Sequence, residues 1–322
     1  MKRRQFTAAL GVLPLAGTAL AQGDDWPQRT VRIVCPFTPG GSQDNIARRL
    51  GTKLQDYLGQ SFVIDNRTGA GGTIGTTAVA QSRPDGYTLL IQTAASHASN
   101  PHLYKKLPYD ALNDFAAISP LAKLVAVLTV HPSLPTRSVK ELITLAQKRP
   151  EEILFGHAGY GSFIHLNAVL MQSRTGIQVT QVPFKGGGPA VVGLVSGQTH
   201  AMIAGIGDII EHIKAKRVRA LAVTSLERVA QLPEIPRMAD TVPGFECTTW
   251  VSIFAPAGTP RPLIDQLNAE LGNSLRDPQV ASRMSGVTYD PVHGTPEALT
   301  ERVKADYAKI GELFRQFSVT VD

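Results

Sequence analysis

The sequence has few cysteines, few aromatic residues and no apolar run long enough to cross a membrane. Its 322 residues include only two cysteines, Cys35 and Cys247, which excludes a dense disulfide framework and leaves open whether these two pair. Aromatic residues make up 6% of the chain, and neither a basic tail nor a basic stripe interleaved with aromatics is present, which argues against a nucleic-acid partner. The apolar stretch near the start is shorter than the roughly 20 residues that a ~30 Å hydrocarbon core requires.

Signatures of catalysis and of metal binding are also missing. There is no H-E-x-x-H, and the eight histidines do not cluster as metal ligands do. Ser162 precedes His165 by three residues, but GYGSF is not the G-x-S-x-G of a nucleophile elbow. A dinucleotide site after Phe155 would need an acidic residue about 20 positions later, where the chain instead continues from Gln178 as QVTQ. We therefore expect no enzyme, no metal and no cofactor.

Residues 1–21 read as an export signal. Three basic residues at positions 2–4 precede the apolar stretch Thr7–Leu15, and the small-residue site ALA at 19–21 follows. Cleavage there would leave Gln22 as the first mature residue. No cysteine follows that site to carry a lipid anchor, and the paired arginines leave both the Sec and the twin-arginine route open.

The predicted mature chain is too long for one ordinary hydrophobic core and alternates between two secondary-structure periods. About 300 residues with 43% hydrophobic content favour two lobes. The formal charge is +6, of which three charges belong to the signal. Short β-rich runs alternate with helical periods, which is typical of parallel α/β architecture. Predicted strands cover 32–37, 62–65, 87–92, 125–130, 153–155, 178–182 and 250–255, with others near 201 and 220.

Helix boundaries are marked by capping residues. A helix over residues 44–58 should end at Gly59, and Ser138 with Glu141 predicts a capping box that opens a helix ended by Pro150. After residue 255 the chain is mostly helical and has too few strands for a lobe of its own. We expect a first lobe of residues 22–124 plus 250–322 and a second lobe of residues 125–249, with hinge crossings near 122–130 and 246–254.

Three junctions between a strand and a helix are rich in glycine. They are TPGGSQD after Phe37, GHAGYGS after Phe155 and FKGGGPA after Val182. Ligands of open α/β sheets bind beyond the carboxyl ends of strands, where helix N-termini favour an anion. Each loop by itself could be only a tight turn, but three at such positions indicate a site for a carboxylate.

Eight segments follow one another along the whole predicted mature chain: VRIVCPFTPGGSQDNIARRL, VIDNRTGAGGTIG, RPDGYTLL, LPYDALNDFAAIS, AGYGSFIHL, QVPFKGGGPA, VRALAVTSLERVAQLPEIP and APAGTP. Together they resemble the Bug family of receptors that serve tripartite tricarboxylate transporters. The resemblance implies the α/β type II periplasmic-binding-protein fold, with two lobes that each hold a mixed, largely parallel sheet flanked by helices and that are joined by a two-strand hinge. It also implies a monomeric periplasmic receptor that binds a small carboxylate or amino acid and delivers it to membrane transporter subunits.

The resemblance also implies which residues hold the ligand, mostly through backbone amides, hydroxyls and bridging water. From the first lobe these are Phe37, Gly40, Gly41, Ser42 and Asp44, and from the second lobe Gly161, Ser162, His165, Phe184, Lys185 and Gly186. Thr93 and Ser96 follow the strand that ends at Gln92 and resemble a polar loop of the family. Asp44 could instead stabilise the start of its helix, and Lys185 could be solvated.

The chain departs from the family pattern at two of these loops. His157 stands where the family commonly has a serine, so we expect its imidazole to contact the ligand and to influence selectivity, with a packed loop histidine as the alternative. Phe184 replaces an expected tyrosine and removes a phenolic donor. Which acid binds is not determined by the sequence. A role as ligand-sensing partner of a membrane signalling protein, with the same fold, also stays open.

Overall fold

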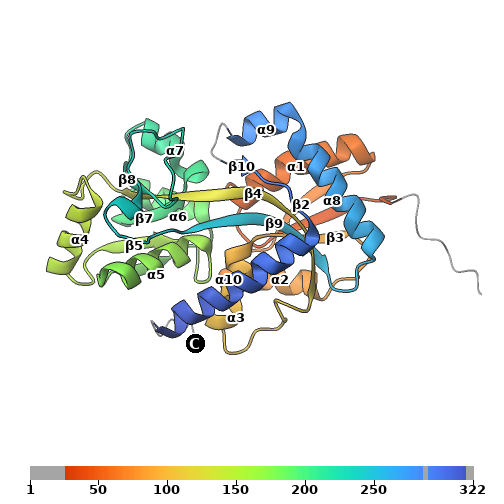
Figure 1. Cartoon of the computed structure of the whole chain (residues 1–322), viewed down its shortest axis with the longest axis horizontal. Helices are drawn as coiled ribbons and strands as arrows, with labels where there is room; N and C mark the ends of the chain where they lie inside the picture. The colour runs from red at the N-terminus through yellow and green to blue at the C-terminus, as the bar shows by residue number, and fades with distance from the viewer. Residues whose placement is uncertain (1–25, 286–288, 317–322) are drawn as a thin grey trace, which may run out of the picture.

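The computed structural model describes residues 26–285 and 289–316, so the predicted signal peptide lies outside the described residues. Two halves lie side by side along the long axis of the molecule (Figure 1). Within the described ranges the strands form a mixed ten-stranded sheet in the order β2-β1-β3-β9-β4-β7-β5-β6, with β8 and β10 paired to β4 off this path. The predicted two-lobed α/β fold is confirmed.

The first lobe, as we use the term below, holds the elements on one side of the two long strands β4 and β9. Its strands are β1 (Val31–Cys35), β2 (Phe62–Asn66), β3 (Thr88–Thr93) and β10 (Tyr289–Pro291). Its helices are α1 (Ser42–Leu58), the 3-10 turn η1 (Ala70–Gly72), α2 (Thr73–Ala80), α3 (Ala94–Leu103), α8 (Arg261–Arg276), α9 (Pro278–Ser285) and α10 (Pro296–Gln316). Strand β1 pairs in parallel with both β2 and β3.

The second lobe holds the elements on the other side of β4 and β9. Its strands are β5 (Leu154–His157), β6 (Thr180–Pro183), β7 (Ala201–Gly205) and β8 (Arg219–Val223). Its helices are α4 (Val139–Lys148), α5 (Phe163–Thr175), α6 (Gly187–Val195), α7 (Ile206–Lys214) and the 3-10 turn η2 (Met238–Asp240). Strand β5 pairs in parallel with β6 and β7.

Strands β4 (Phe115–Val130) and β9 (Thr248–Pro256) run antiparallel between the halves. Strand β4 pairs with β9 as far as Val125 and with β7 from Ala126 onward. The sequence predicted only residues 125–130 as a strand here, which was wrong for the first half of β4. Pro120 and two register shifts interrupt the alternation that marks a strand, and the neighbouring strand β9 keeps this segment extended nonetheless.

Local capping explains where two helices begin and end. Gly59 adopts a left-handed conformation, φ 70°, and its N–H donates to the carbonyl of Gln55, so the predicted C-cap of α1 is confirmed. At the start of α4 the hydroxyl of Ser138 accepts from the backbone N–H of Glu141. The Glu141 carboxylate reaches back to the N–H of Arg137 instead of Ser138, so only half of the predicted capping box forms.

The two cysteines are both free and buried. Burial raises the pKa of the Cys35 thiol and of the Cys247 thiol to about 12, because an apolar environment disfavours the thiolate. Cys35 lies on β1 and Cys247 directly precedes β9, so each thiol fills core space of the sheet. Cys35 and Cys247 therefore do not form the disulfide that the sequence left open.

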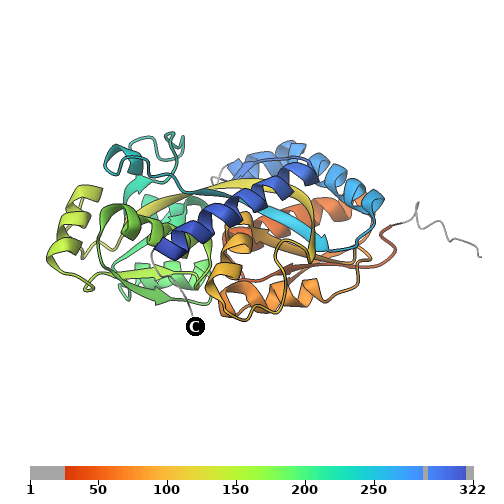
Figure 2. The same cartoon turned by 60° about the horizontal axis from the view of Figure 1, so that its bottom comes forward.

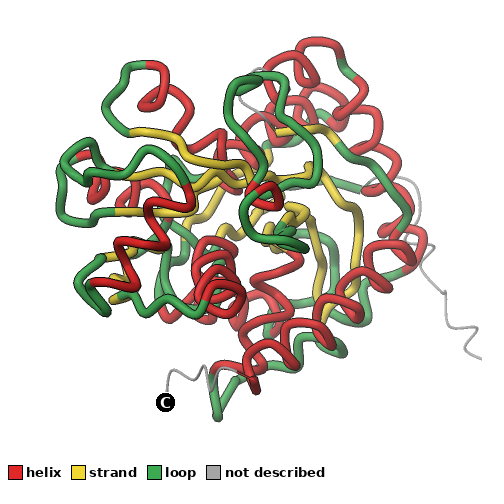
Figure 3. Tube along the Cα trace, turned by 60° about the vertical axis from the view of Figure 1, so that its left-hand side comes forward, coloured by secondary structure: helices red, strands yellow, loops and turns green. Residues whose placement is uncertain are grey.

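Helices cover the sheet from both faces, with the strands in the middle of the molecule (Figure 3). Helix α10 packs on α3 and on β4, and its far end reaches toward the second lobe (Figure 2). Helix α8 packs on α1 and on β4. Over the two described ranges, no helix is long and apolar enough to cross a membrane.

Candidate functional site

A cavity of about 40 Å3 lies where the two lobes meet. A buried water needs about 10–15 Å3 in this measure, so the space corresponds to a few water molecules. Both lobes contribute to its wall, and β4 contributes Leu124. The lining residues are Phe37, Thr38, Gly41, Ser42, Gln43, Asp44, Thr93, Leu124, Ala158, Ser162, Phe163, Ile164, Gly187, Gly205 and Asp208.

The N-terminal ends of five helices reach this cavity, namely α1, α3, α5, α6 and α7. Their orphan N–H groups and aligned peptide dipoles favour negative charge. Thr93 caps α3 and Ser162 caps α5 with their side-chain oxygens. The N-caps of α1, α6 and α7 are Gly41, Gly186 and Gly205, and none provides a side-chain cap. The cavity is therefore suited to an anion that supplies the missing acceptor.

Ser162 is the clearest hydroxyl donor on the second-lobe side of the cavity. It is 3% exposed, and its Oγ accepts from the backbone N–H of His165 at 3.1 Å. Its hydroxyl hydrogen remains available, since a serine hydroxyl can accept and donate at once. Its position is set by the tight turn that precedes α5, in which Gly159 and Gly161 both have positive φ.

Asp44 belongs to the first-lobe wall but is bound within its own lobe. Its carboxylate accepts from the backbone N–H of Gly40 at 3.0 Å, from Nε of Arg48 at 2.9 Å and from Nδ2 of Asn66 at 3.1 Å. Burial would raise the pKa of Asp44, but the bonds from Arg48, Gly40 and Asn66 outweigh it and hold that pKa below its ordinary value. The structure therefore favours the helix-stabilising role for this carboxylate.

Asp208 connects the two lobes from the first turn of α7. Its two carboxylate oxygens accept from Oγ of Ser42 at 2.7 and 2.8 Å, and Oδ1 also accepts from the Tyr289 hydroxyl at 3.1 Å. Ser42 and Tyr289 belong to the first lobe. Burial raises the pKa of Asp208 to about 6, although these two hydroxyls and the backbone N–H of Ser42 partly oppose the shift. Asp208 is thus an ionisable group at the cavity wall whose hydrogen bonds join the second lobe to the first.

Two polar atoms of the first lobe are buried at the cavity without a partner. Oγ1 of Thr38 and Oε1 of Gln43 make no hydrogen bond to any described residue. Both residues line the cavity. A buried polar atom left unpaired costs about 1–3 kcal/mol, so a ligand that pairs with these atoms would recover part of that free energy.

His157 lies in an aromatic cluster with Tyr160 and His165 and is not among the cavity-lining residues. Its ring centroid is 4.9 Å from each of those two rings, and His165 lies 6.3 Å from Phe314 of α10. Within the described part of the chain, neither ring nitrogen of His157 forms a well-aligned hydrogen bond. Burial lowers the pKa of His157 to about 4. Burial and the neighbouring imidazole of His157 lower the pKa of His165 to about 3. Both imidazoles are neutral at physiological pH.

Of the residues predicted for the site, six line the cavity: Phe37, Gly41, Ser42, Asp44, Thr93 and Ser162. The others lie elsewhere. Ser96 hydrogen-bonds to Thr93 within the α3 cap, and Lys185 is exposed. Phe184 packs with the apolar core of the second lobe. Gly40, Gly161 and Gly186 lie in the loops at the lobe boundary, where Gly186 approaches Thr38 and Gly161 approaches Asn100. Direct contact of any of these residues with a ligand stays a prediction.

Several lining residues were missed by the sequence interpretation, chiefly Thr38, Gln43, Gly187, Gly205 and Asp208. The first two lie inside the TPGGSQD loop that was recognised as a whole. Gly205 ends β7 and Asp208 lies in the first turn of α7, at a junction between a strand and a helix like the other three but with fewer glycines. The rule that ligands bind beyond the carboxyl ends of strands would have included this junction.

A larger hollow of about 790 Å3 lies elsewhere, between α5, α10 and the segment before β9. It is lined mainly by α10 side chains and by the C-terminal half of α5, and of the five helix N-termini named above only α3, through Ala95, contributes a first-turn residue to it. We therefore place the candidate site at the smaller cavity. In residues 26–285 and 289–316, no three His, Cys, Asp or Glu side chains gather as metal ligands would.

The fold and the cavity define a class: a two-lobed solute-binding protein of the type II periplasmic-binding-protein fold. The family model described as "Tripartite tricarboxylate transporter family receptor" matches residues 46–319, and the chain belongs to that family of receptors, which is not an enzyme family. Protein BugT of Bordetella pertussis is 37% identical over 301 residues, covering 92% of each protein. The resemblance to Bug receptors is confirmed.

Two solved structures are similar over nearly the whole chain. The Rhodopseudomonas palustris protein Rpa4515, solved with adipate, is 36% identical with a TM-score of 0.87, covering 90% of this chain and 98% of that one. MatC from the same organism, solved with bound malate, is 30% identical with a TM-score of 0.86, covering 89% and 99%. The two ligands named for these proteins are both dicarboxylates.

Proposed function

We propose that this protein is an exported receptor that captures a small carboxylate or amino acid between its two lobes and delivers it to the membrane subunits of a tripartite transporter. The observation that carries the proposal is the meeting of five helix N-termini at one cavity, three of them without side-chain caps. A carboxylate held in such a place gains about 1.5–3 kcal/mol per charge-assisted hydrogen bond. Membership of the receptor family and the adipate and malate complexes of relatives support it.

The carboxylate is best received on the second-lobe side, near Ser162 and the start of α6 at Gly187. Ser162 offers a hydroxyl hydrogen, and the first N–H groups of α6 have no side-chain acceptor. From the first lobe, Thr38 and Gln43 add unpaired polar atoms. A ligand that contacts both sides stabilises the closed arrangement by its differential affinity for it.

Strands β4 and β9 would act as the hinge in this proposal. They are the long strands that run between the halves, and β4 changes partner from β9 to β7 between Val125 and Ala126. We accordingly retain the division into residues 22–124 plus 250–322 and residues 125–249. Opening about these strands would admit the ligand, and the closed form would dock on the transporter as a monomer after export to the periplasm.

The proposal is tested by thermal unfolding of the mature chain with a panel of small carboxylic acids and amino acids, each beside its amide or ester. A ligand at a hundredfold excess over Kd stabilises the folded state by about 2.7 kcal/mol. For a protein of this size that raises Tm by roughly 5 °C or more. We expect a carboxylate to give this shift and its neutral derivative to give none, because only the anion pairs with the helix N-termini.

Protein that carries a bound ligand from its host would hide the shift, so the panel is repeated after unfolding, dialysis and refolding. Ser196→Ala serves as a control beside variants of the cavity, since Ser196 is exposed at the other end of α6. Stabilisation by nucleotides or metal ions, with none by any carboxylate, would contradict the proposed function.

A further inference from the structure

Asp208 is the charged group at the cavity that no other charge in the described residues balances. Two of the lining side chains are charged, Asp44 and Asp208, and no lysine or arginine is among them. Asp44 is paired with Arg48 at 2.9 Å. Asp208 forms no ion pair in the described ranges, and it accepts from neutral groups: the hydroxyls of Ser42 and Tyr289 and the backbone N–H of Ser42.

The surroundings of Asp208 leave its carboxylate short of donors. One hydroxyl hydrogen of Ser42 is shared between the two oxygens, one of Tyr289 reaches Oδ1, and the backbone N–H of Ser42 is a third donor. An ionised carboxylate offers about four acceptor positions. Glycines adjoin it on the second-lobe side, since a Cβ at Gly187 or Gly205 would lie 3.4 or 3.2 Å from Oδ2. The carboxylate can therefore receive a further donor from the cavity.

A ligand with two carboxylates would bring like charge next to this group. The two ligand carboxylates and Asp208 would then place three negative charges in one small cavity without a basic side chain. Such an arrangement is costly at low dielectric. A ligand that carries its own cation avoids this cost. Its ammonium can face Asp208, while its carboxylate faces Ser162 and the N-terminus of α6 on the other wall.

We propose that Asp208 receives the ammonium group of a zwitterionic ligand, so that this receptor selects small amino acids over the corresponding plain acids. The inference rests on the proposed function, because it concerns the same cavity and names the class of its ligand. The ammonium replaces the missing counter-charge and adds a charge-assisted hydrogen bond, which the matching dicarboxylate or monocarboxylate lacks.

The test compares pairs that differ only in the amino group: L-aspartate with succinate, L-glutamate with glutarate, and L-alanine with propionate. Affinity is measured by isothermal titration calorimetry on refolded, ligand-depleted protein at pH 7.5. We expect the preferred amino acid to bind at least tenfold more tightly than its partner. This comparison uses the unmodified protein and so does not depend on any variant folding.

Asp208→Asn should weaken the preferred amino acid at least tenfold and reduce its advantage over the plain acid. Asp208→Glu keeps the charge and should retain part of the preference. Asp306→Asn is the matched control, because Asp306 is a carboxylate paired with Arg302 on α10, outside the cavity. We expect its affinities to equal those of the parent protein.

Two results would overturn the assignment while leaving the receptor function intact. They are tighter binding of succinate or glutarate than of the amino acid, and unchanged selectivity in Asp208→Asn. If no acid of either kind binds, the proposed function itself is wrong, and the two failures are thus distinguished.

Discussion

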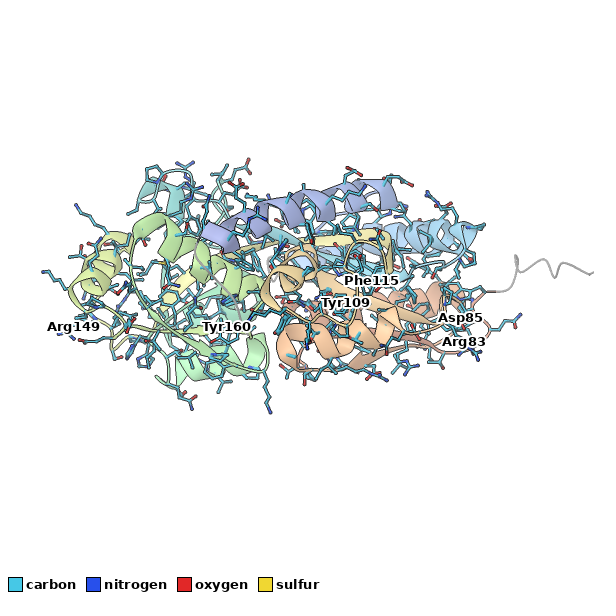
Figure 4. The ribbon with its side chains drawn as sticks, turned by 90° about the horizontal axis from the view of Figure 1, so that it is seen from below. Arg83, Asp85, Tyr109, Phe115, Arg149 and Tyr160 are labelled. Carbon is cyan, nitrogen blue, oxygen red and sulfur yellow. The ribbon has the colours of Figure 1, made fainter. Side chains whose placement is uncertain are left out.

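Gly71→Ala should weaken ligand binding although Gly71 does not line the ligand cavity. Gly71 lies in η1 of the first lobe, and a Cβ there would overlap the backbone carbonyl of Tyr160 in the second lobe. It would also lie 2.8 Å from the hydroxyl of Tyr104. Figure 4 shows Tyr160 and Tyr109 on the two sides of the lobe boundary. The added methyl group therefore obstructs the contact through which the lobes meet.

The expected loss of ligand affinity follows from overpacking. An extra methyl group in a packed contact costs about 1–3 kcal/mol, which here falls on the closed form and lowers apparent affinity about 5–150-fold. The substitution also places alanine at φ 61°, a strain of about 1–2 kcal/mol. Gly59→Ala separates the two effects, because Gly59 has φ 70° in the same lobe with no atom within 4 Å of the added Cβ.

Both variants are measured by calorimetric titration with the best ligand from the carboxylate panel and by small-angle scattering of the complex. We expect Gly59→Ala to lose stability but to bind and compact like the parent protein. Gly71→Ala should lose comparable stability and, in addition, bind more weakly and remain more extended. Equal affinity and equal compaction in the two variants would refute the reasoning that closure depends on this contact.

Three further outcomes are expected. Ser162→Ala should weaken carboxylate binding by about 1–3 kcal/mol and, because Ser162 caps α5, lower Tm by about 2 °C, as calorimetry and thermal unfolding will report. Burial lowers the pKa of His97 to about 4, so the unfolded chain takes up a proton below pH 6.5 that the folded chain refuses. Stability in urea should therefore fall by about 2 kcal/mol between pH 7 and pH 5 from His97 alone, and constant stability would contradict this. Mass spectrometry of periplasmic protein should find Gln22 at the N-terminus, whereas a retained Met1 would exclude the cleaved signal.

Local features of the fold were predictable because they depend on neighbours in the sequence. Gly59 ends α1, Ser138 caps α4, and the strand and helix periods place most elements within a few residues of their observed bounds. The glycine-rich loops were found for the same reason, since a turn from a strand into a helix needs particular residues at particular offsets.

Features that depend on distant partners were not predictable in this way. The first half of β4 reads poorly as a strand because Pro120 lies within it, and pairing with β9 more than a hundred residues later is what extends it. His157 ends β5, yet its ring packs in a cluster with Tyr160 and His165 that extends to Phe314 of α10, and it does not line the cavity. Side-chain direction there depends on rings that only the folded chain brings together.

The sequence by itself determined the α/β alternation, the two-lobed design and the suitability of the loops for an anion, because these follow from hydrophobic period, chain length and helix N-termini. The tertiary structure decided which groups share one site. Asp208 meets Ser42 across 166 residues of sequence and Tyr289 across 81. Charge balance in a cavity is a property of all the groups around it, and only folding across the hinge strands brings those groups to hydrogen-bonding distance.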